Sequence, residues 1–322
     1  MNILITGITG LFGSQLAREF SQLGIIHGLR QETSDLALVK DCGFDIHWNQ
    51  GELSDVDSLV EALEGIDLVI HSAGCVSFSS KDEDKLYEVN SKGTANLVNA
   101  MLFAGVKRLV HVSSVAAIGR STELTVLDED FKWTESPLNT PYALSKYWAE
   151  LEAWRGEQEG LDLIVVNPSV LLGKANAGRS STLIYTYVLE ENRFFPKGDV
   201  NYIDVRDAAK ITRRLVEAQA WGSRFILNAG SISYQHFFST VAEVFGKKAP
   251  IFPVKDWMIA LAPLGFGLLR LFGFGKNQIT KQVARLSQQK IRFDNAKVQK
   301  LLDYRYYTLR ESLEWAKEPE SN

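Results

Sequence analysis

A glycine-rich turn near the start of the chain most strongly constrains the fold. The apolar run Ile3-Leu4-Ile5 predicts a strand, and Thr6-Gly7-Ile8-Thr9-Gly10-Leu11-Phe12-Gly13 follows it directly and opens a helical pattern that ends at Gly24. A strand, a glycine turn and a helix in this order present backbone N–H groups to a phosphate. We expect Gly7 to allow the tight turn, Gly10 the close approach of a pyrophosphate, and Gly13 close packing of helix on strand. The alternative is the same turn without a ligand.

Strand and helix patterns alternate along the first half of the chain. Apolar segments predict strands at 24–30, 44–48, 67–71, 106–112 and 161–167, the last of which completes the sheet. Helical patterns cover 56–63 and a longer stretch from Leu86 to Val98, in which Asn90 is expected to bond a neighbouring backbone carbonyl. The alternation predicts an α/β protein with a doubly wound parallel sheet. Ligands bind at the carboxyl ends of such strands, where the glycine turn, Arg30, 72–74 and 113–114 fall.

The composition argues against nucleic-acid binding, a disulfide framework and a metal site. At 322 residues and a net charge of -4, the chain has room for a large core and no basic field, so we expect no nucleic acid as a partner. Cys42 and Cys75 are too few for a disulfide framework, and the five histidines show no metal-ligand spacing, so we expect no metal. The N-terminus lacks the pattern of a signal peptide, which predicts a cytoplasmic protein.

Arg30 ends the second predicted strand, where the adenosine ribose of a bound dinucleotide normally lies. An acidic residue there hydrogen-bonds the ribose 2′-hydroxyl, whereas an arginine accommodates a 2′-phosphate. Gln31 follows, and the nearest acids are Glu32 and Asp35. We therefore expect NADP(H) rather than NAD(H) as the cofactor, the alternative being a solvated arginine at a strand end.

Tyr142 and Lys146 stand four residues apart in a segment with a helical pattern, and Pro141 occupies a position that a first helical turn tolerates. The spacing puts both side chains on one helix face, one turn apart. A tyrosine that acts as an acid or base near neutrality needs its pKa lowered by roughly three from ~10, or about 4 kcal/mol. The lysine charge and a cationic cofactor ring would supply part of this. Taken alone, the pair also fits a solvated helix face.

Several motifs together resemble the extended short-chain dehydrogenase/reductases. The glycine turn, His71-Ser72-Ala73-Gly74, the segment 89–94, Ser113-Ser114 and Tyr142-x-x-x-Lys146 carry the resemblance, which spans nearly the full length. Within that family the chain is most similar to the branch of dihydroflavonol reductases and 3β-hydroxysteroid dehydrogenases, also labelled NAD-dependent epimerase/dehydratase. Segments 167–173, 202–207 and 293–297 match the same branch.

The resemblance implies roles for individual residues. Tyr142 matches the catalytic tyrosine that passes a proton to or from the substrate oxygen, and Lys146 matches the lysine that binds the nicotinamide ribose and lowers the pKa of the tyrosine. Ser114, five residues before Gly119, matches the serine that holds the substrate oxygen, with Ser113 as the alternative. The implied cofactor contacts are Gly7, Thr9, Gly10, Leu11, Phe12, Gly13, Arg30, Glu52, Leu53, Ser72, Ala73, Gly74, Tyr142, Lys146 and Pro168.

Two departures from the family pattern affect these expectations. Gly51-Glu52-Leu53 replaces the common Gly-Asp-Leu, which puts the adenine contact in doubt. Ile118-Gly119 replaces the Tyr-Gly common in epimerases. We therefore expect an NADP(H)-dependent oxidoreductase that transfers a hydride between nicotinamide and a carbonyl or alcohol of an apolar small molecule. The alternatives are a nucleotide-sugar epimerase or dehydratase with tightly bound NAD, and a non-catalytic protein on the same fold.

The chain is expected to form two parts. Residues 1–168 form the dinucleotide-binding domain, to which 204–228 returns, while 169–203 and 229–322 form a smaller substrate lobe. The loop 175–181 is expected to line the substrate pocket or to move as a lid. The apolar stretch 257–274 predicts a roof over the pocket or an oligomer contact, or else a peripheral contact with lipid. We expect a monomer or a homodimer.

Overall fold

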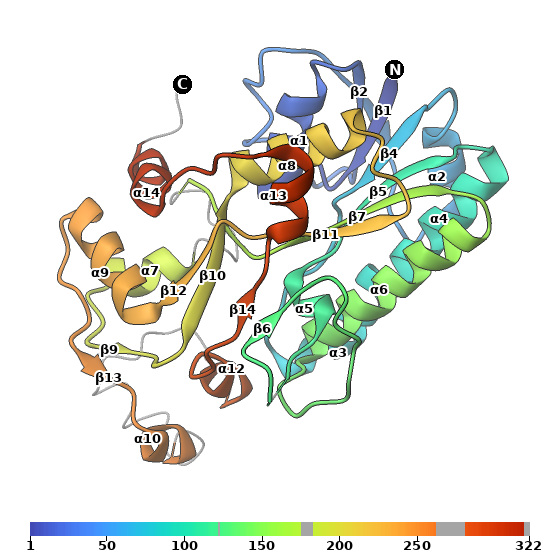
Figure 1. Ribbon diagram of the computed structural model, residues 1–322. Helices are drawn as coiled ribbons and strands as arrows, with labels where there is room; N and C mark the ends of the chain where they lie inside the picture. Colours follow the sequence, from blue (N-terminus) through green and yellow to red (C-terminus); the bar gives the residue numbers. More distant parts are fainter. Residues whose placement is uncertain (122, 175–182, 262–280, 319–322) are drawn as a thin grey trace.

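A seven-stranded parallel sheet forms the centre of the computed structural model, which describes residues 1–121, 123–174, 183–261 and 281–318 (Figure 1). The strand order is β3-β2-β1-β4-β5-β7-β11, which confirms the doubly wound parallel sheet. The strands are β1 (Asn2–Thr6), β2 (Ile25–Arg30), β3 (Ile46–Gln50), β4 (Leu68–His71), β5 (Arg108–Val112), β7 (Asp162–Pro168) and β11 (Ser223–Leu227).

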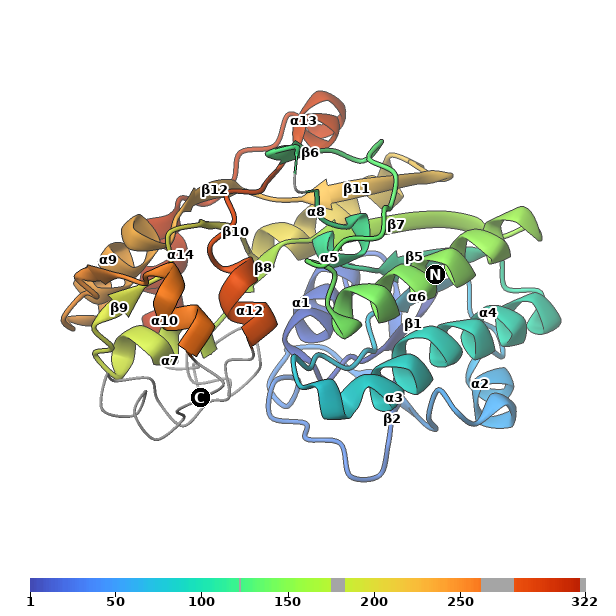
Figure 2. The same cartoon turned by 90° about the horizontal axis from the view of Figure 1, so that it is seen from below.

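Helices cover both faces of this sheet and bury an apolar layer on each (Figure 2). On β1, Ile3 and Ile5 face one layer and Leu4 the other, as the two-residue period of a strand requires. One face carries α1 (Leu11–Phe20), α8 (Val205–Glu217) and α13 (Ala296–Leu302). The other carries α2 (Val56–Ala62), α4 (Gly93–Ala104) and α6 (Pro141–Gln158).

Three local predictions were wrong in detail. The third strand lies at Ile46–Gln50 rather than 44–48, in a register that sets the Trp48 ring over Gly28, where a Cβ would lie 2.7 Å from that ring. The long helix is divided into α3 (Glu83–Leu86), a π-helical segment (Tyr87–Lys92) and α4. The sheet also does not end with 161–167, because the buried run of β11 adds a strand outside β7.

A second part of the chain contains the three-stranded sheet β12-β10-β8 and a separate apolar core. Its elements are β8 (Val170–Leu172), α7 (Leu183–Leu189), β9 (Phe194–Phe195), β10 (Asp199–Asp204), β12 (Gly230–Ser233), α9 (Tyr234–Phe245), β13 (Phe252–Pro253), α10 (Asp256–Leu261), α12 (Lys281–Leu286) and α14 (Leu309–Lys317). The short strands β6 (Val126–Leu127) and β14 (Arg292–Phe293) pair beside α5 (Val115–Ile118), and η1 spans Ser80–Asp82. The division into two domains stays a prediction.

The two segments predicted to border the substrate fall largely outside the described residues. These are 175–181, and 262–274 of the apolar stretch 257–274. Of its described part, Trp257 is exposed whereas Met258 and Ile259 are buried. Among the helices of the described ranges, none is both long and apolar enough to cross a bilayer. The lipid contact stays a prediction.

Candidate active site

The parallel sheet brings the sequence-predicted residues to one edge. Thr6, His71 and His111 are aligned in register on the neighbouring strands β1, β4 and β5. The turns that follow these strands carry the glycine turn, 72–74 and Ser113-Ser114, so segments more than a hundred residues apart in the sequence meet there (Figure 1). This edge is where a doubly wound sheet binds its ligand.

The glycine turn packs closely against the turn after β4 and against itself. Gly7 has a φ of 67°, and a Cβ there would lie 2.6 Å from the backbone of Ala73. A Cβ on Gly13 would lie 2.1 Å from the carbonyl oxygen of Gly7, whereas one on Gly10 would meet only that oxygen, at 3.1 Å. The geometry fits the tight turn expected at Gly7 and the close packing expected at Gly13, whereas the pyrophosphate contact expected of Gly10 stays a prediction.

The N-terminus of α1 has free backbone donors. Gly10 is the N-cap and contributes no side-chain cap, and the first helical bond runs from the Ser14 N–H to the Gly10 carbonyl. The N–H groups of Leu11, Phe12 and Gly13 precede that bond and so lack a partner within the helix. They fit a phosphate. The Leu11 side chain packs against Gly173, and Phe12 is buried in the core. Thr9 lies within the turn.

Arg30 and Glu52 lie close together at the ends of β2 and β3. The guanidinium of Arg30 stacks over the Trp48 ring at 5.2 Å, and the Arg30 carbonyl accepts from the Gly51 N–H. Glu52 accepts from Gln31 at 2.9 Å, so its carboxylate is beside the residue that follows Arg30. The Leu53 side chain instead packs against Gly93 at the start of α4. Arg30 and Glu52 therefore offer opposite charges to the same region.

The turn after β4 is tied to the glycine turn and to α6. The Ala73 N–H donates to the Thr6 hydroxyl at 3.2 Å, and Ser72 precedes it in the same turn. Asn90, in the π-helical segment, accepts from the Cys75 N–H at 2.7 Å and donates to the Cys75 carbonyl at 2.9 Å and to Ser145 at 3.0 Å. The prediction that Asn90 bonds a neighbouring backbone carbonyl is confirmed.

Ser114 and Tyr142 are brought together by two helix N-termini. Ser114 caps α5, accepting from the Ala116 N–H at 3.1 Å, and Thr140 caps α6, so Tyr142 falls in its first turn. The hydroxyls of Ser114 and Tyr142 form a hydrogen bond with each other. Burial raises the pKa of Tyr142, and this hydrogen bond offsets only part of the effect. Burial thus raises the pKa of the tyrosine, and the lowering by Lys146 that the resemblance implies stays a prediction.

Lys146 has a buried amine one helical turn beyond Tyr142. Its Nζ donates to the Val112 carbonyl at the end of β5 at 2.8 Å, and a Cβ on Gly74 would lie 4.0 Å from it. Burial lowers the pKa of Lys146 to about 8, and the nearby Glu150 carboxylate opposes the shift. The amine therefore lies between two of the strand-end turns. Pro168 ends β7, in register with Leu227 on β11.

Glu150 is a buried site residue that sequence reasoning missed. Its Oε2 accepts from Ser113 at 2.7 Å and from Asn167 at 2.8 Å, and its Oε1 accepts from Trp154 and Arg224, each at 3.3 Å. Ser113, the alternative for the catalytic serine, is thus directed to Glu150 and not to Tyr142. The sequence places Glu150 on the same helix face as Tyr142 and Lys146, at a repeated spacing of four, but that spacing alone does not show that Glu150 is buried.

Two buried histidines lie beneath the site and were not singled out from the sequence. His71 hydrogen-bonds with Thr6 at 2.8 Å and Thr94 at 3.0 Å, and Thr94 donates to the Asn90 carbonyl. Burial and the Lys146 charge lower the pKa of His71 to about 3 and also lower that of His111. Both imidazoles are therefore neutral next to the lysine.

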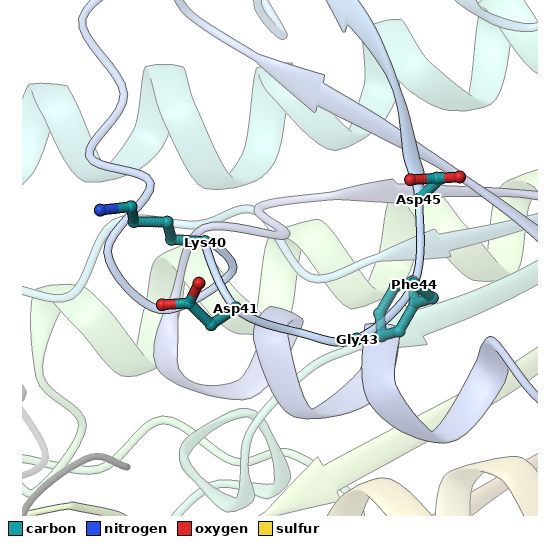
Figure 3. Close-up of a pocket in the computed structure, with 5 residues that line it drawn as sticks. All are labelled: Lys40, Asp41, Gly43, Phe44 and Asp45. Atoms are coloured by element: carbon teal, nitrogen blue, oxygen red, sulfur yellow. The ribbon is translucent and has the colours of Figure 1, made fainter. Parts of the chain in front are cut away.

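Two surface hollows lie away from these residues. Figure 3 shows the first, on the loop between β2 and β3, lined by Lys40, Asp41, Gly43, Phe44 and Asp45. The second, of about 460 Å³, lies between α1 and α14 and includes Leu11, Arg18, Lys174, Arg206 and Trp315. Neither contains Ser114, Tyr142 or Lys146. Across the described ranges no group of three or more histidine, cysteine or acidic side chains is placed to hold a metal ion.

Comparisons with known proteins agree with this geometry. A sequence profile of the NAD dependent epimerase/dehydratase family matches residues 3–230. A Synechocystis sp. protein provisionally named dihydroflavonol 4-reductase is 32% identical over 277 residues, covering 81% of this chain and 80% of that protein. Cinnamoyl-CoA reductase 1 of Petunia hybrida is 30% identical over 217 residues, covering 64% of this chain and 62% of the reductase. The crystal structure of gox2253 superposes with a TM-score of 0.84 and 29% identity, covering 98% and 96% of the two chains.

Proposed function

The chain belongs to the NAD dependent epimerase/dehydratase family and is an NAD(P)-dependent oxidoreductase of the extended short-chain type, and we propose that it uses NADP(H) to reduce a carbonyl on an apolar small molecule. The observation that carries the proposal is the hydrogen bond between Ser114 and Tyr142 at the strand-end edge, with the buried amine of Lys146 one turn away. These groups supply a proton donor, a holder for the substrate oxygen and an anchor for the cofactor ribose.

The glycine turn and the turn after β4 fit a dinucleotide. The free N–H groups of 11–13 would hold the pyrophosphate, and the small residues Ser72, Ala73 and Gly74 leave room for the nicotinamide half beside Lys146. The cofactor, when bound, supplies the hydride that adds to the carbonyl carbon. The chain itself supplies position, charge and the proton.

The protonation state of Tyr142 suits the reduction of a carbonyl. The ordinary pKa of tyrosine is ~10 and burial raises it further, so the phenol is protonated at neutral pH. This is the form that can donate to the alkoxide that develops as the carbonyl is reduced. With substrate bound, the single O–H of Ser114 would turn to the same oxygen in place of the phenol and stabilise its negative charge. One proton from Tyr142 and one hydride complete the alcohol, and solvent returns the proton to the phenol.

NADP(H) is proposed as the cofactor because of Arg30. Its guanidinium is held by the Trp48 ring at the end of β2, where the adenosine ribose would lie. Arg30→Asp should move the ratio of kcat/KM for NADPH over NADH at least about 10-fold toward NADH. Arg108→Asp, at the opposite edge of the sheet, is the matched control and should leave the ratio unchanged. An unchanged ratio in Arg30→Asp would remove this residue from the 2′-phosphate site.

An apolar substrate is proposed from the side chains beside Tyr142. The Phe78 ring lies edge-on to the Tyr142 ring at 6.0 Å and is 48% exposed, and the nearby Val76 is 43% exposed. Exposed apolar groups beside a proton donor fit an aryl or alkyl body next to the carbonyl. The two reductases above are named for a dihydroflavonol and for cinnamoyl-CoA, both of which carry an aromatic group.

The direct test is loss of nicotinamide absorbance when NADPH or NADH is mixed with aromatic and aliphatic aldehydes and ketones. We expect NADPH oxidation with aromatic carbonyls ahead of small aliphatic ones. Oxidation with none of them, together with nicotinamide absorbance in the purified protein before any addition, would contradict the proposal and favour a nucleotide-sugar epimerase or dehydratase.

A further inference from the structure

Arg120 holds a partly buried guanidinium close to Ser114. It follows α5, the short helix that Ser114 caps, and its Nη1 donates to the carbonyl oxygens of Val115 at 3.3 Å and Gly119 at 3.0 Å. Val115 is the residue directly after Ser114. The Arg120 side chain therefore folds back along α5 and reaches its first turn, the end of the helix that carries the serine.

Within the part of the chain that the structure describes, no acidic side chain neutralises the charge of Arg120. No carboxylate in the described ranges forms an ion pair with it, whereas the partly buried Arg206 pairs with Asp204 at 2.6 Å and Arg224 with Glu150 at 3.3 Å. Burial lowers the pKa of Arg120 to about 10, and Tyr234 opposes that shift only in part. Arg120 is partly buried, and a partly buried charge without a carboxylate partner is available to a counter-ion.

The guanidinium also has donors to spare. Both of its bonds to the chain come from Nη1, which leaves Nε and Nη2 without an acceptor among the described residues. One face packs over the Phe293 ring at 5.1 Å, which fixes the plane of the group. Nε and Nη2 form the planar fork that binds a carboxylate or phosphate through two parallel hydrogen bonds.

The neighbours of Arg120 place this fork between the two parts of the chain. Phe293 is on β14 and Tyr234 begins α9, while α5 packs against α6, which carries Tyr142 and Lys146 (Figure 2). We propose that Arg120 binds a carboxylate or phosphate on the substrate, at the end remote from the reacting carbonyl. This subsite rests on the proposed reduction and narrows its substrate to an apolar body that carries one anionic group.

The test compares matched aldehydes with NADPH and the full chain. The probes are 4-formylbenzoate, 4-formylphenyl phosphate and the neutral methyl 4-formylbenzoate. Wild-type protein should show a kcat/KM about 10-fold to 100-fold higher for at least one anionic aldehyde than for the ester, as expected for hydrogen bonds to a charged group. The two anionic probes decide between a carboxylate and a phosphate.

Arg120→Gln should abolish the preference for anionic aldehydes and leave kcat/KM for the ester within about twofold of wild type. Arg120→Lys should keep part of the preference, because lysine still offers a point charge. Arg292→Gln removes an exposed arginine next to Phe293 and should change neither value. Equal preference in wild type and Arg120→Gln would overturn the subsite, as would equal losses for ester and anion, which a purely structural role of Arg120 predicts.

A binding measurement separates this inference from the proposed function. Calorimetry of NADP+-loaded protein with 4-(hydroxymethyl)benzoate and its methyl ester needs no turnover. Tighter binding of the acid to wild type, lost in Arg120→Gln, would support the subsite even if no aldehyde were reduced. Absence of any affinity difference would reject it even if the ester were reduced well.

Discussion

Glu150→Gln tests whether the buried carboxylate positions the catalytic groups. The carboxylate accepts four donors, two on each oxygen. A glutamine can keep Ser113 and Asn167 on its carbonyl oxygen, but its amide nitrogen then faces Trp154 and Arg224, which are also donors. Each donor left without an acceptor costs about 1–3 kcal/mol.

Arg224 keeps two backbone acceptors, the carbonyls of Glu129 and Phe131. We therefore expect Glu150→Gln to lower the free energy of unfolding by about 2–3 kcal/mol. In a chain of 322 residues that lowers the melting temperature by about 3–4 °C. Glu150 also favours the charged form of Lys146, so its loss moves the pKa of Lys146 below about 8. Cofactor affinity should then fall at a lower pH than in wild type, because the charged amine is the form that holds the ribose.

The assay is a thermal melt together with NADPH titration from pH 6 to 10. Glu152→Gln, two residues on and paired with Arg155 at the surface, is the control and should change stability by less than about 1 kcal/mol. The positioning role would be refuted if Glu150→Gln kept the wild-type melting temperature and lost NADPH affinity at the same alkaline pH as wild type.

Two further predictions follow from the same geometry. Gly13→Ala places a methyl 2.1 Å from the Gly7 carbonyl and should lower the free energy of unfolding, measured by chemical denaturation, by about 1–3 kcal/mol or more. Gly10→Ala should melt near the wild-type temperature yet bind NADPH about 10-fold more weakly. Equal losses of stability in the two variants would contradict this. Burial raises the pKa of Asp207 to about 6, so the folded state holds its proton longer than the unfolded state, and stability should fall as pH rises from about 4 to about 6. Asp207→Asn should remove that slope in urea melts, and an identical slope would show that another group titrates.

Patterns close in sequence predicted most of the architecture. Buried parallel strands are continuous apolar runs, which is why β1, β4 and β5 could be placed from their residues. The π-helical segment could not, because it depends on Asn90 bridging to Cys75 and Ser145, which are distant in sequence. The shift of β3 likewise depends on Trp48 packing over Gly28.

The site was predictable where its chemistry is local. The spacing of Tyr142 and Lys146 is visible in the sequence, whereas Glu150 resembles an acid on a solvated helix until β5, β7 and β11 are brought around it. Arg120 gave no sequence signal at all, since its significance depends on which side chains of the described ranges surround it in three dimensions.

The most direct test of the central claim compares single-turnover oxidation of NADPH in wild type and Tyr142→Phe, each mixed with the aromatic aldehyde that wild type reduces best, alongside cofactor titration of both. The phenylalanine keeps the ring packed against Phe78 and removes only the hydroxyl that Ser114 contacts. We predict that the rate falls by roughly 10²-fold or more while NADPH affinity stays within about twofold. A rate in Tyr142→Phe equal to that of wild type would contradict the assignment of the proton donor and the mechanism built on it.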